Sequence, residues 1–214
     1  DLLRLGYSPC PNDTYIFGHL AQGLVAHPGF SLAHELHDVE TLNTMAFDPA
    51  RRLDVTKLSF FAWLMLRDEY RILDSGSALG DFGPVLIARE HCTKEDLPDL
   101  RIAAPGKWTT AHLLLRLWAP EAGKRYFTSY DRIFDELSQG RADLGLIIHE
   151  SRFTFEQAGF VRIIDLGEWW KEQTGLRIPL GCIAARKKLG KQRIQDVETL
   201  IRKSLQAAHA NPDQ

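Results

Sequence analysis

His149 is the residue in this sequence best suited to proton transfer. It directly follows an apolar run without alternation, Leu144 to Ile148, which is typical of a strand buried on both faces. A residue at the end of such a strand faces a cleft rather than the core, and an imidazole with a pKa of ~6.5 is the usual general base near neutral pH. We therefore expect His149 to be a catalytic base. The alternative is a histidine that caps a backbone carbonyl.

A second group of residues that could bind or react with a substrate is Thr56-Lys57-Leu58-Ser59, which follows Val55 and precedes an aromatic helix. A cation flanked by two hydroxyls favours a carboxylate or phosphate partner, although a solvated lysine over the surface is the alternative. A covalent Schiff base on Lys57 is possible in principle. Because we expect Lys57 to open a helix rather than to lie in an apolar pocket, we favour an electrostatic role.

Two further junctions between expected strands and helices carry polar side chains. In the stretch from Pro105 to Thr110, Gly106 lets backbone approach a ligand, and Thr109 and Thr110 are suited to cap a helix or hold an anion. In the stretch from Ser8 to Thr14, Asn12 or Asp13 is a natural N-cap. In open α/β sheets, ligands bind beyond the carboxyl ends of strands, where helix N-termini favour anions. Each junction taken alone is also explained as an ordinary helix cap.

Several other kinds of site are disfavoured. The nucleotide-binding patterns GxGxxG and GxxxxGK[ST] and the hydrolase pattern GxSxG do not occur. The spacing of His34, His37 and His91 supplies no third or fourth ligand in register, so we expect no metal and no cofactor. The cysteines Cys10, Cys92 and Cys182 lie far apart and form no disulfide framework.

The elements that must position these residues alternate along the chain as expected for an α/β fold. Helical spacing is clearest from Tyr130 to Leu137, before Gly140, and from Ile194 to Leu205. The strand Leu144 to Ile148 is predicted to be central in its sheet. Expected strands cover Leu2 to Gly6, Phe30 to Leu36, Val55, Ile72 to Leu73, Val85 to Ala88, Arg101 to Ala104, Leu144 to Ile148, Val161 to Leu166 and Leu180 to Ala185.

Composition narrows the class of protein and of partner. The chain has 214 residues, and its 26 Lys and Arg against 28 Asp and Glu give a net charge of −2, so we expect no nucleic-acid partner. No apolar run approaches the ~20 residues that a membrane-spanning helix needs, so we expect no membrane partner. The few cysteines and the lack of a leader favour a cytoplasmic location. The oligomeric state is not readable.

Two lobes are expected rather than one domain. The polar stretch from Glu90 to Asp99 suggests one crossing between lobes, and Gly175 to Pro179 suggests the return. We therefore predict a discontinuous first lobe of residues 1–90 plus 179–214, and an inserted second lobe of residues 91–178.

The sequence resembles the 1,4-dihydroxy-6-naphthoate synthase family, the cyclic dehypoxanthinyl futalosine lyases of menaquinone biosynthesis. The similarity covers essentially the whole chain, and its most specific parts are SPCPND, TKLS and IIHESRFT. The matching stretches are LRLGYSPCPNDTYIF from Leu3, DVETLN from Asp38, VTKLSFFA from Val55, GKWTTAHLLL from Gly106, LGLIIHESRFT from Leu144 and IDLGEWW from Ile164.

This resemblance implies a two-lobed, periplasmic-binding-protein type II-like α/β fold with a double crossover and a small carboxylate substrate between the lobes. It implies that His149 is the catalytic base and that Thr56, Lys57, Leu58, Ser59, Thr109 and Thr110 line the substrate pocket. Asp13, Asn43 and Arg152 lie in matching motifs. Family members continue beyond the position of Gln214, so the resemblance implies that the first lobe lacks its C-terminal helices.

The implied reaction is a carbon–carbon lyase step that converts cyclic dehypoxanthinyl futalosine to 1,4-dihydroxy-6-naphthoate without a metal or redox cofactor. Two alternatives share the fold. The related chorismate dehydratases lack the SPCPND opening, and a solute-binding receptor would bind a small molecule without changing it.

Overall fold

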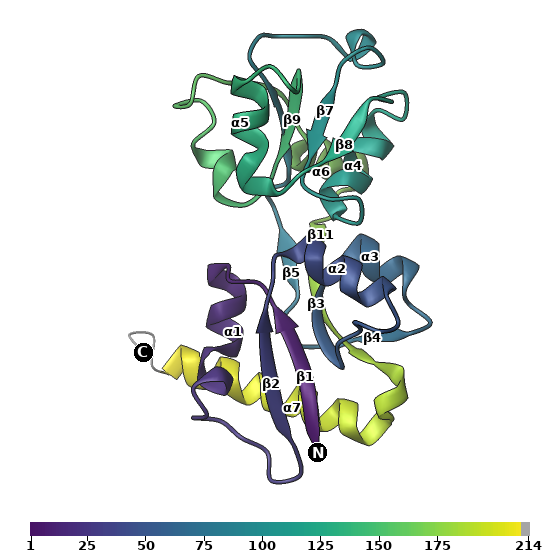
Figure 1. Cartoon of the computed structure of the whole chain (residues 1–214). Helices are drawn as coiled ribbons and strands as arrows, with labels where there is room; N and C mark the ends of the chain where they lie inside the picture. The colour runs from purple at the N-terminus through teal and green to yellow at the C-terminus, as the bar shows by residue number, and fades with distance from the viewer. Residues whose placement is uncertain (211–214) are drawn as a thin grey trace. The chain divides into compact units, whose positions relative to one another are not determined.

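The computed structural model describes residues 1–210 and divides the chain into two compact units (Figure 1). The first unit comprises Asp1–Ala78 and resumes at Gly181, and the second comprises Leu79–Leu180. Residues 211–214, which the sequence analysis assigned to the first lobe, lie outside the described residues.

The first crossing lies earlier in the chain than the predicted boundary at residue 90. Val85–Ala88 forms strand β6, which pairs with two strands of the second unit and therefore belongs to that unit's sheet. The polar stretch from Glu90 to Asp99 lies within the second unit and contains a short 3₁₀ helix, Lys94–Asp96. The polar residues of this stretch therefore belong to a surface loop and not to a crossing between the two units.

The first unit is built on a mixed sheet with the strand order β2-β1-β3-β11-β4, and β5 pairs with β11. Strand β1 is parallel to β2 and β3, whereas β11 runs antiparallel to β3 and β4. The strands are β1 (Leu2–Tyr7), β2 (Ser31–Leu36), β3 (Val55–Ser59), β4 (Tyr70–Ile72), β5 (Ala78–Gly80) and β11 (Ile178–Arg186).

The second unit has a mixed five-stranded sheet with the order β10-β6-β9-β7-β8. Strand β9 (Leu144–Ile147) is fully buried and lies in the middle, which confirms the prediction from its unalternating sequence. It is parallel to β7 and antiparallel to β6. The other strands are β6, β7 (Ile102–Ala104), β8 (Arg125–Phe127) and β10 (Val161–Asp165).

Helices cover both faces of each sheet. In the first unit, α1 and α7 pack on one face through apolar residues such as Phe17 and Ile201, and α2 with α3 covers the other (Figure 1). Successive residues of β11 pack alternately into the cores on the two faces of the sheet, because side chains alternate along a strand. These helices are α1 (Pro11–Ala21), α2 (Val39–Phe47), α3 (Phe60–Met65) and α7 (Lys191–Ala210).

In the second unit, α4 (Thr110–Trp118) and α6 (Leu166–Thr174) pack on one face of the sheet. Helix α5 (Ile133–Ser138) packs on the other face. The helical pattern predicted from Tyr130 begins as the 3₁₀ helix Tyr130–Arg132 and becomes α-helical only at Ile133.

Each predicted strand is present, and two short ones were missed. Strands β5 and β8 have three residues each, which is too short for a pattern of alternation to emerge. Within residues 1–210, none of the helices combines the length and apolar character needed to span a bilayer.

Candidate functional site

One edge of the second unit's sheet gathers the polar loops of that unit. Strands β7, β8 and β9 are parallel, so the segments that follow their last residues emerge at the same edge. Strand β6 is antiparallel to β9 and begins at this edge, and β10 ends there, since Asp165 pairs with Val85. We call this edge the carboxyl edge of the second sheet.

His149 is exposed and lies just beyond β9, as the first residue of the 3₁₀ helix η3 (His149–Phe153). Its φ of 56° is left-handed, and within residues 1–210 no other residue except glycine has a positive φ. Such a conformation costs about 1–2 kcal/mol for a residue with a Cβ, so the surrounding structure must hold it. The Tyr130 ring, from the loop after β8, lies edge-on to the imidazole at 5.1 Å between centroids.

Arg152 anchors the turn that carries His149. Its Nη1 donates to the Gly83 carbonyl at 2.5 Å, and its Nη2 donates to Asp165 Oδ2 at 2.9 Å. The other oxygen of Asp165 accepts from the Gly167 backbone N–H at 2.7 Å and thereby caps α6. The Asp165 side chain is only 2% exposed, so this ion pair is internal. Both terminal nitrogens of Arg152 are thus engaged within the protein, and its Nε is buried without a partner among the described residues. The resemblance implied instead that Arg152 binds the substrate.

Aromatic and glycine residues complete the surroundings of Arg152. The exposed rings of Phe82 and Phe153 lie 4.9 Å and 5.6 Å from its guanidinium carbon. Gly83 and Gly167 approach so closely that a Cβ on either would lie within 2.7 Å of backbone atoms of the other. The backbone at the start of β6 therefore packs directly on the start of α6.

Thr109 and Thr110 lie at the start of α4, beyond the end of β7. Thr109 is the N-cap, as the sequence suggested: its Oγ1 accepts from the His112 backbone N–H at 3.2 Å and donates to the Gly106 carbonyl at 3.0 Å. The Thr110 hydroxyl donates to the Leu180 carbonyl at 3.0 Å. Both hydroxyls thus have internal partners, and the anion-binding capacity of this turn lies in the first backbone N–H groups of the helix.

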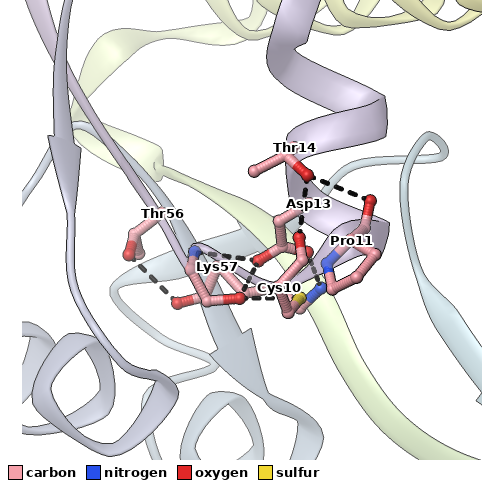
Figure 2. Close-up of polar contacts among 7 residues, drawn as sticks. Cys10, Pro11, Asp13, Thr14, Thr56 and Lys57 are labelled. Atoms are coloured by element: carbon pink, nitrogen blue, oxygen red, sulfur yellow. Dashed lines mark hydrogen bonds and ion pairs between the residues drawn. The ribbon is translucent and has the colours of Figure 1, made fainter.

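In the first unit, the Lys57 ammonium forms an ion pair with Asp13 Oδ1. The second carboxylate oxygen of Asp13 accepts from the Ser8 backbone N–H at 2.9 Å and from its hydroxyl at 2.7 Å. Figure 2 shows the lysine side chain meeting Asp13 at the first turn of α1. Asp13 is fully buried and Lys57 is 6% exposed, so the pair is shielded from water.

This arrangement corrects three expectations. Lys57 lies inside strand β3 and does not open a helix. Its expected position at a helix start therefore no longer favours an electrostatic role over a Schiff base. Lys57 is also not a solvated lysine, since its charge is buried and paired with Asp13. The N-cap of α1 is Cys10 rather than Asn12 or Asp13, because Pro11 already occupies the first helical position.

The remaining predicted residues of the first unit are buried around the same strand. The Thr56 hydroxyl donates to the Lys57 carbonyl at 3.1 Å, and Leu58 lies in the core with Tyr70 and Cys182. Asn43, from α2, is fully buried and bonds Ser59 twice: its Oδ1 accepts from the Ser59 N–H at 2.9 Å, and its Nδ2 donates to the Ser59 hydroxyl at 3.0 Å.

The structure thus brings the predicted site residues together in two groups. Strand β3, the start of α1 and the middle of α2 hold Asp13, Asn43 and residues 56–59. The carboxyl edge of the second sheet holds Thr109, Thr110, His149 and Arg152.

Sequence reasoning missed the residues that support these groups. Ser8 was expected only as part of a turn. Asp165 fell inside the expected strand Val161 to Leu166, although it is the N-cap of α6 and an aspartate is a common N-cap. In the part of the chain that the structure describes, no group of three or more His, Cys, Asp or Glu side chains is placed to hold a metal ion.

Comparison with known proteins gives a family and close relatives. Residues 3–214 match a family described as menaquinone biosynthesis. A 1,4-dihydroxy-6-naphthoate synthase of Thermus thermophilus is 46% identical over 215 residues, covering 100% of this chain and 77% of that protein. One of Streptomyces coelicolor is 38% identical over 220 residues, covering 100% of this chain and 76% of that protein.

Solved structures show the same fold. A protein of Archaeoglobus fulgidus is 35% identical, with a TM-score of 0.90 over 99% of this chain and 78% of that one. The alkanesulfonate-binding protein of Xanthomonas axonopodis has a TM-score of 0.69 at 15% identity, over 95% of this chain and 72% of that one. At that identity the likeness shows the fold alone, which is the periplasmic-binding-protein fold implied by the resemblance.

Proposed function

This chain belongs to the menaquinone biosynthesis family, and we propose that within it the protein acts as a 1,4-dihydroxy-6-naphthoate synthase. The enzyme class rests on relatives of that name at 46% and 38% identity along the whole chain. The reaction is a carbon–carbon lyase step on a small carboxylate, cyclic dehypoxanthinyl futalosine, as the resemblance to the family implies.

His149 is the general base of this proposal. The imidazole takes a proton from a hydroxyl of the sugar-derived ring, the resulting alkoxide collapses to a carbonyl, and the adjacent carbon–carbon bond breaks. The released electron pair enters the remaining ring system, which becomes aromatic and draws the cleavage forward. The observation that carries the assignment is the exposed His149 at the end of the central strand, held in a left-handed conformation.

The start of α4 supplies the anion contact. Thr109 and Thr110 use their hydroxyls internally, so we propose that they present backbone N–H groups at the helix N-terminus to a substrate carboxylate or to developing oxyanion charge. This start lies at the same edge of the sheet as His149, because β7 and β9 are neighbouring parallel strands.

The first unit's residues have a supporting role in the proposal. Lys57 is neutralised by Asp13, and Asn43 is committed to Ser59, so residues 56–59 shape and stiffen the end of β3 rather than offering a free cation. A cytoplasmic location and a small-molecule partner complete the proposal. The three cysteines are all free, in keeping with a reducing compartment.

Product formation tests this function directly. The purified chain is incubated with the cyclic substrate, and the naphthoate is followed by absorbance and mass. His149→Asn is the informative variant, since asparagine tolerates the left-handed conformation better than alanine does. We expect turnover to fall by about 10²–10⁴-fold while binding of the naphthoate is largely retained.

His91→Asn is the matched control, because His91 is an exposed histidine of the same unit that follows the other end of β6. It should leave turnover unchanged. Wild-type turnover in His149→Asn would remove His149 from the mechanism, and unchanged substrate recovered from the folded native chain would refute the enzymatic function.

A further inference from the structure

A cluster of cationic side chains lies between α4 and the edge strand β8 of the second unit. Arg125 begins β8, and Arg116 lies one helical turn beyond His112 on α4. The His112 ring packs edge-on against Phe127 at 5.0 Å between centroids. Because side chains alternate along a strand, Arg125 and Phe127 share the face toward α4, whereas Tyr126 points to Glu136 of α5.

Like charges face one another in this cluster. Burial lowers the pKa of the Arg125 guanidinium from its ordinary value, and the nearby charge of Arg116 adds to the effect. Burial also lowers the pKa of His112. The hydrogen bond to the Lys107 carbonyl opposes this shift, and the charges of Arg125 and Arg116 add to it. Within residues 1–210, no ion pair joins Arg116 or Arg125 to an acidic side chain.

A buried donor in the cluster lacks an acceptor. Arg125 Nη1 is buried and has no hydrogen-bond partner among the described residues. Several other arginines of the unit pair with acids, as Arg101 does with Asp143 and Arg141 with Glu136. A desolvated guanidinium donor without an acceptor is costly, and a ligand oxygen would supply one.

We propose that Arg125 and Arg116, beside the His112 ring, form a binding site for a small oxyanion, a phosphate or a carboxylate, distinct from the proposed catalytic edge. The planar guanidinium of Arg125 suits an oxyanion, which accepts two parallel N–H bonds. Arg116 is exposed on α4, and its positive charge acts on Arg125. Phe127 is 44% exposed and borders the site.

The site is connected to the start of α4. The His112 ring contacts the Lys107 carbonyl through Nδ1 at 2.8 Å, and its backbone N–H is held by Thr109. An anion held by Arg116 and Arg125 offsets the positive charge beside this ring and therefore also braces the turn from Gly106 to Thr110. This predicts that binding raises the thermal stability of the protein.

Thermal unfolding of the full chain, titrated with inorganic phosphate and separately with malonate at constant ionic strength, tests the site. We expect a saturable rise in Tm with at least one of the two, and the arm that saturates at lower concentration identifies the preferred oxyanion. In Arg125→Gln the half-saturating concentration should rise about tenfold or more, because a charge-assisted contact is lost. Arg116→Gln, at an exposed position, should weaken binding even if Arg125→Gln fails to fold.

Arg67→Gln is the matched control, since it removes the same charge from an exposed residue of the other unit. It should leave the titration unchanged. The proposal would be overturned by a rise in Tm that does not saturate, by a rise equal to that with chloride, or by equal binding to Arg116→Gln and to the native chain.

His149→Asn should keep the rise in Tm with the anion. The outcome of this test therefore does not depend on whether His149 is the catalytic base.

Discussion

The ammonium of Lys57 is paired with the carboxylate of Asp13, 44 residues earlier in the chain, in a place where neither group meets water. The pair ties strand β3 to the first turn of α1, and Ser8 supplies the carboxylate with two more hydrogen bonds. A buried charge that loses its counterion keeps its desolvation penalty, so each partner depends on the other.

Breaking this pair from either side should destabilise the first unit. We expect Lys57→Met and Asp13→Asn each to lower the free energy of unfolding by about 3–5 kcal/mol. The double variant should cost less than the sum of the two, since it leaves no buried charge unpaired. Urea denaturation of the four proteins measures the coupling, and strictly additive losses would contradict an energetically linked pair.

Gly181 makes room for the lysine, which leads to a second prediction. A Cβ at this position of β11 would lie 2.8 Å from Lys57 Cε and 3.3 Å from the Leu58 carbonyl oxygen. Gly181→Ala should therefore lower the free energy of unfolding by about 1–3 kcal/mol. The loss should shrink in a Lys57→Ala background, where the lysine stem is absent.

Gly18→Ala is the control for this substitution. Gly18 lies within α1, and nothing lies within 4 Å of a Cβ built there. Alanine should stabilise the helix by about 0.5–1 kcal/mol. If Gly181→Ala were equally harmless, the tight fit around Lys57 would be refuted.

Arg152 ties the turn that carries His149 to Gly83 and Asp165, and we propose that it thereby positions the base, which gives a third prediction. Asp165→Asn keeps an acceptor that can cap α6, yet it removes the charge that holds Arg152. We expect kcat to fall about tenfold or more with little change in KM, because a loosened turn misplaces the base without removing substrate contacts. Arg152→Lys should behave similarly, since lysine lacks the planar fork that reaches Gly83 and Asp165 together.

Arg162→Gln provides the comparison, because the Arg162–Glu168 pair is exposed and 3.4 Å long. Its loss should change stability by less than ~0.5 kcal/mol and leave kcat unaltered. An unaltered kcat in both Asp165→Asn and Arg152→Lys would show that the ion pair does not position His149.

A fourth prediction concerns the stability of the protein at low pH. The hydrogen bonds from the Arg101 guanidinium lower the pKa of Asp143 to about 2. Because the folded pKa lies below the unfolded value of ~3.9, the contribution to stability is present above pH ~4 and is lost as the pH falls toward 2. Asp143→Asn should destabilise the protein by ~1 kcal/mol at pH 7, after allowance for screening, and this difference should vanish near pH 2.

Urea unfolding at pH 7, 5 and 3 gives this dependence. Asp99→Asn is the control, since Asp99 is 94% exposed and its contact with Lys124 is 3.4 Å long. A difference between native and Asp143→Asn protein that stays constant with pH would contradict a stabilising carboxylate at this position.

Short motifs were enough to predict the family and many of the strands and helices. The unalternating run Leu144 to Ile148 predicted a central strand, and Thr109 was a correct N-cap. Such features depend on neighbouring residues, whose spacing is visible in a sequence. The first lobe boundary was misplaced, because a polar loop after β6 looks the same in sequence as a crossing between lobes.

Patterns along the chain were enough to predict the α/β class, the central strand that precedes His149 and the likeness to the naphthoate synthases. The contacts of Lys57 and Arg152 became visible only in the folded protein. Their charges pair with Asp13 and Asp165, and such pairing depends on which strands lie side by side and on how far water reaches. Local spacing fixes the type of an element, but the partner of a buried charge is chosen by packing, since a desolvated ion is stable only beside its counterion.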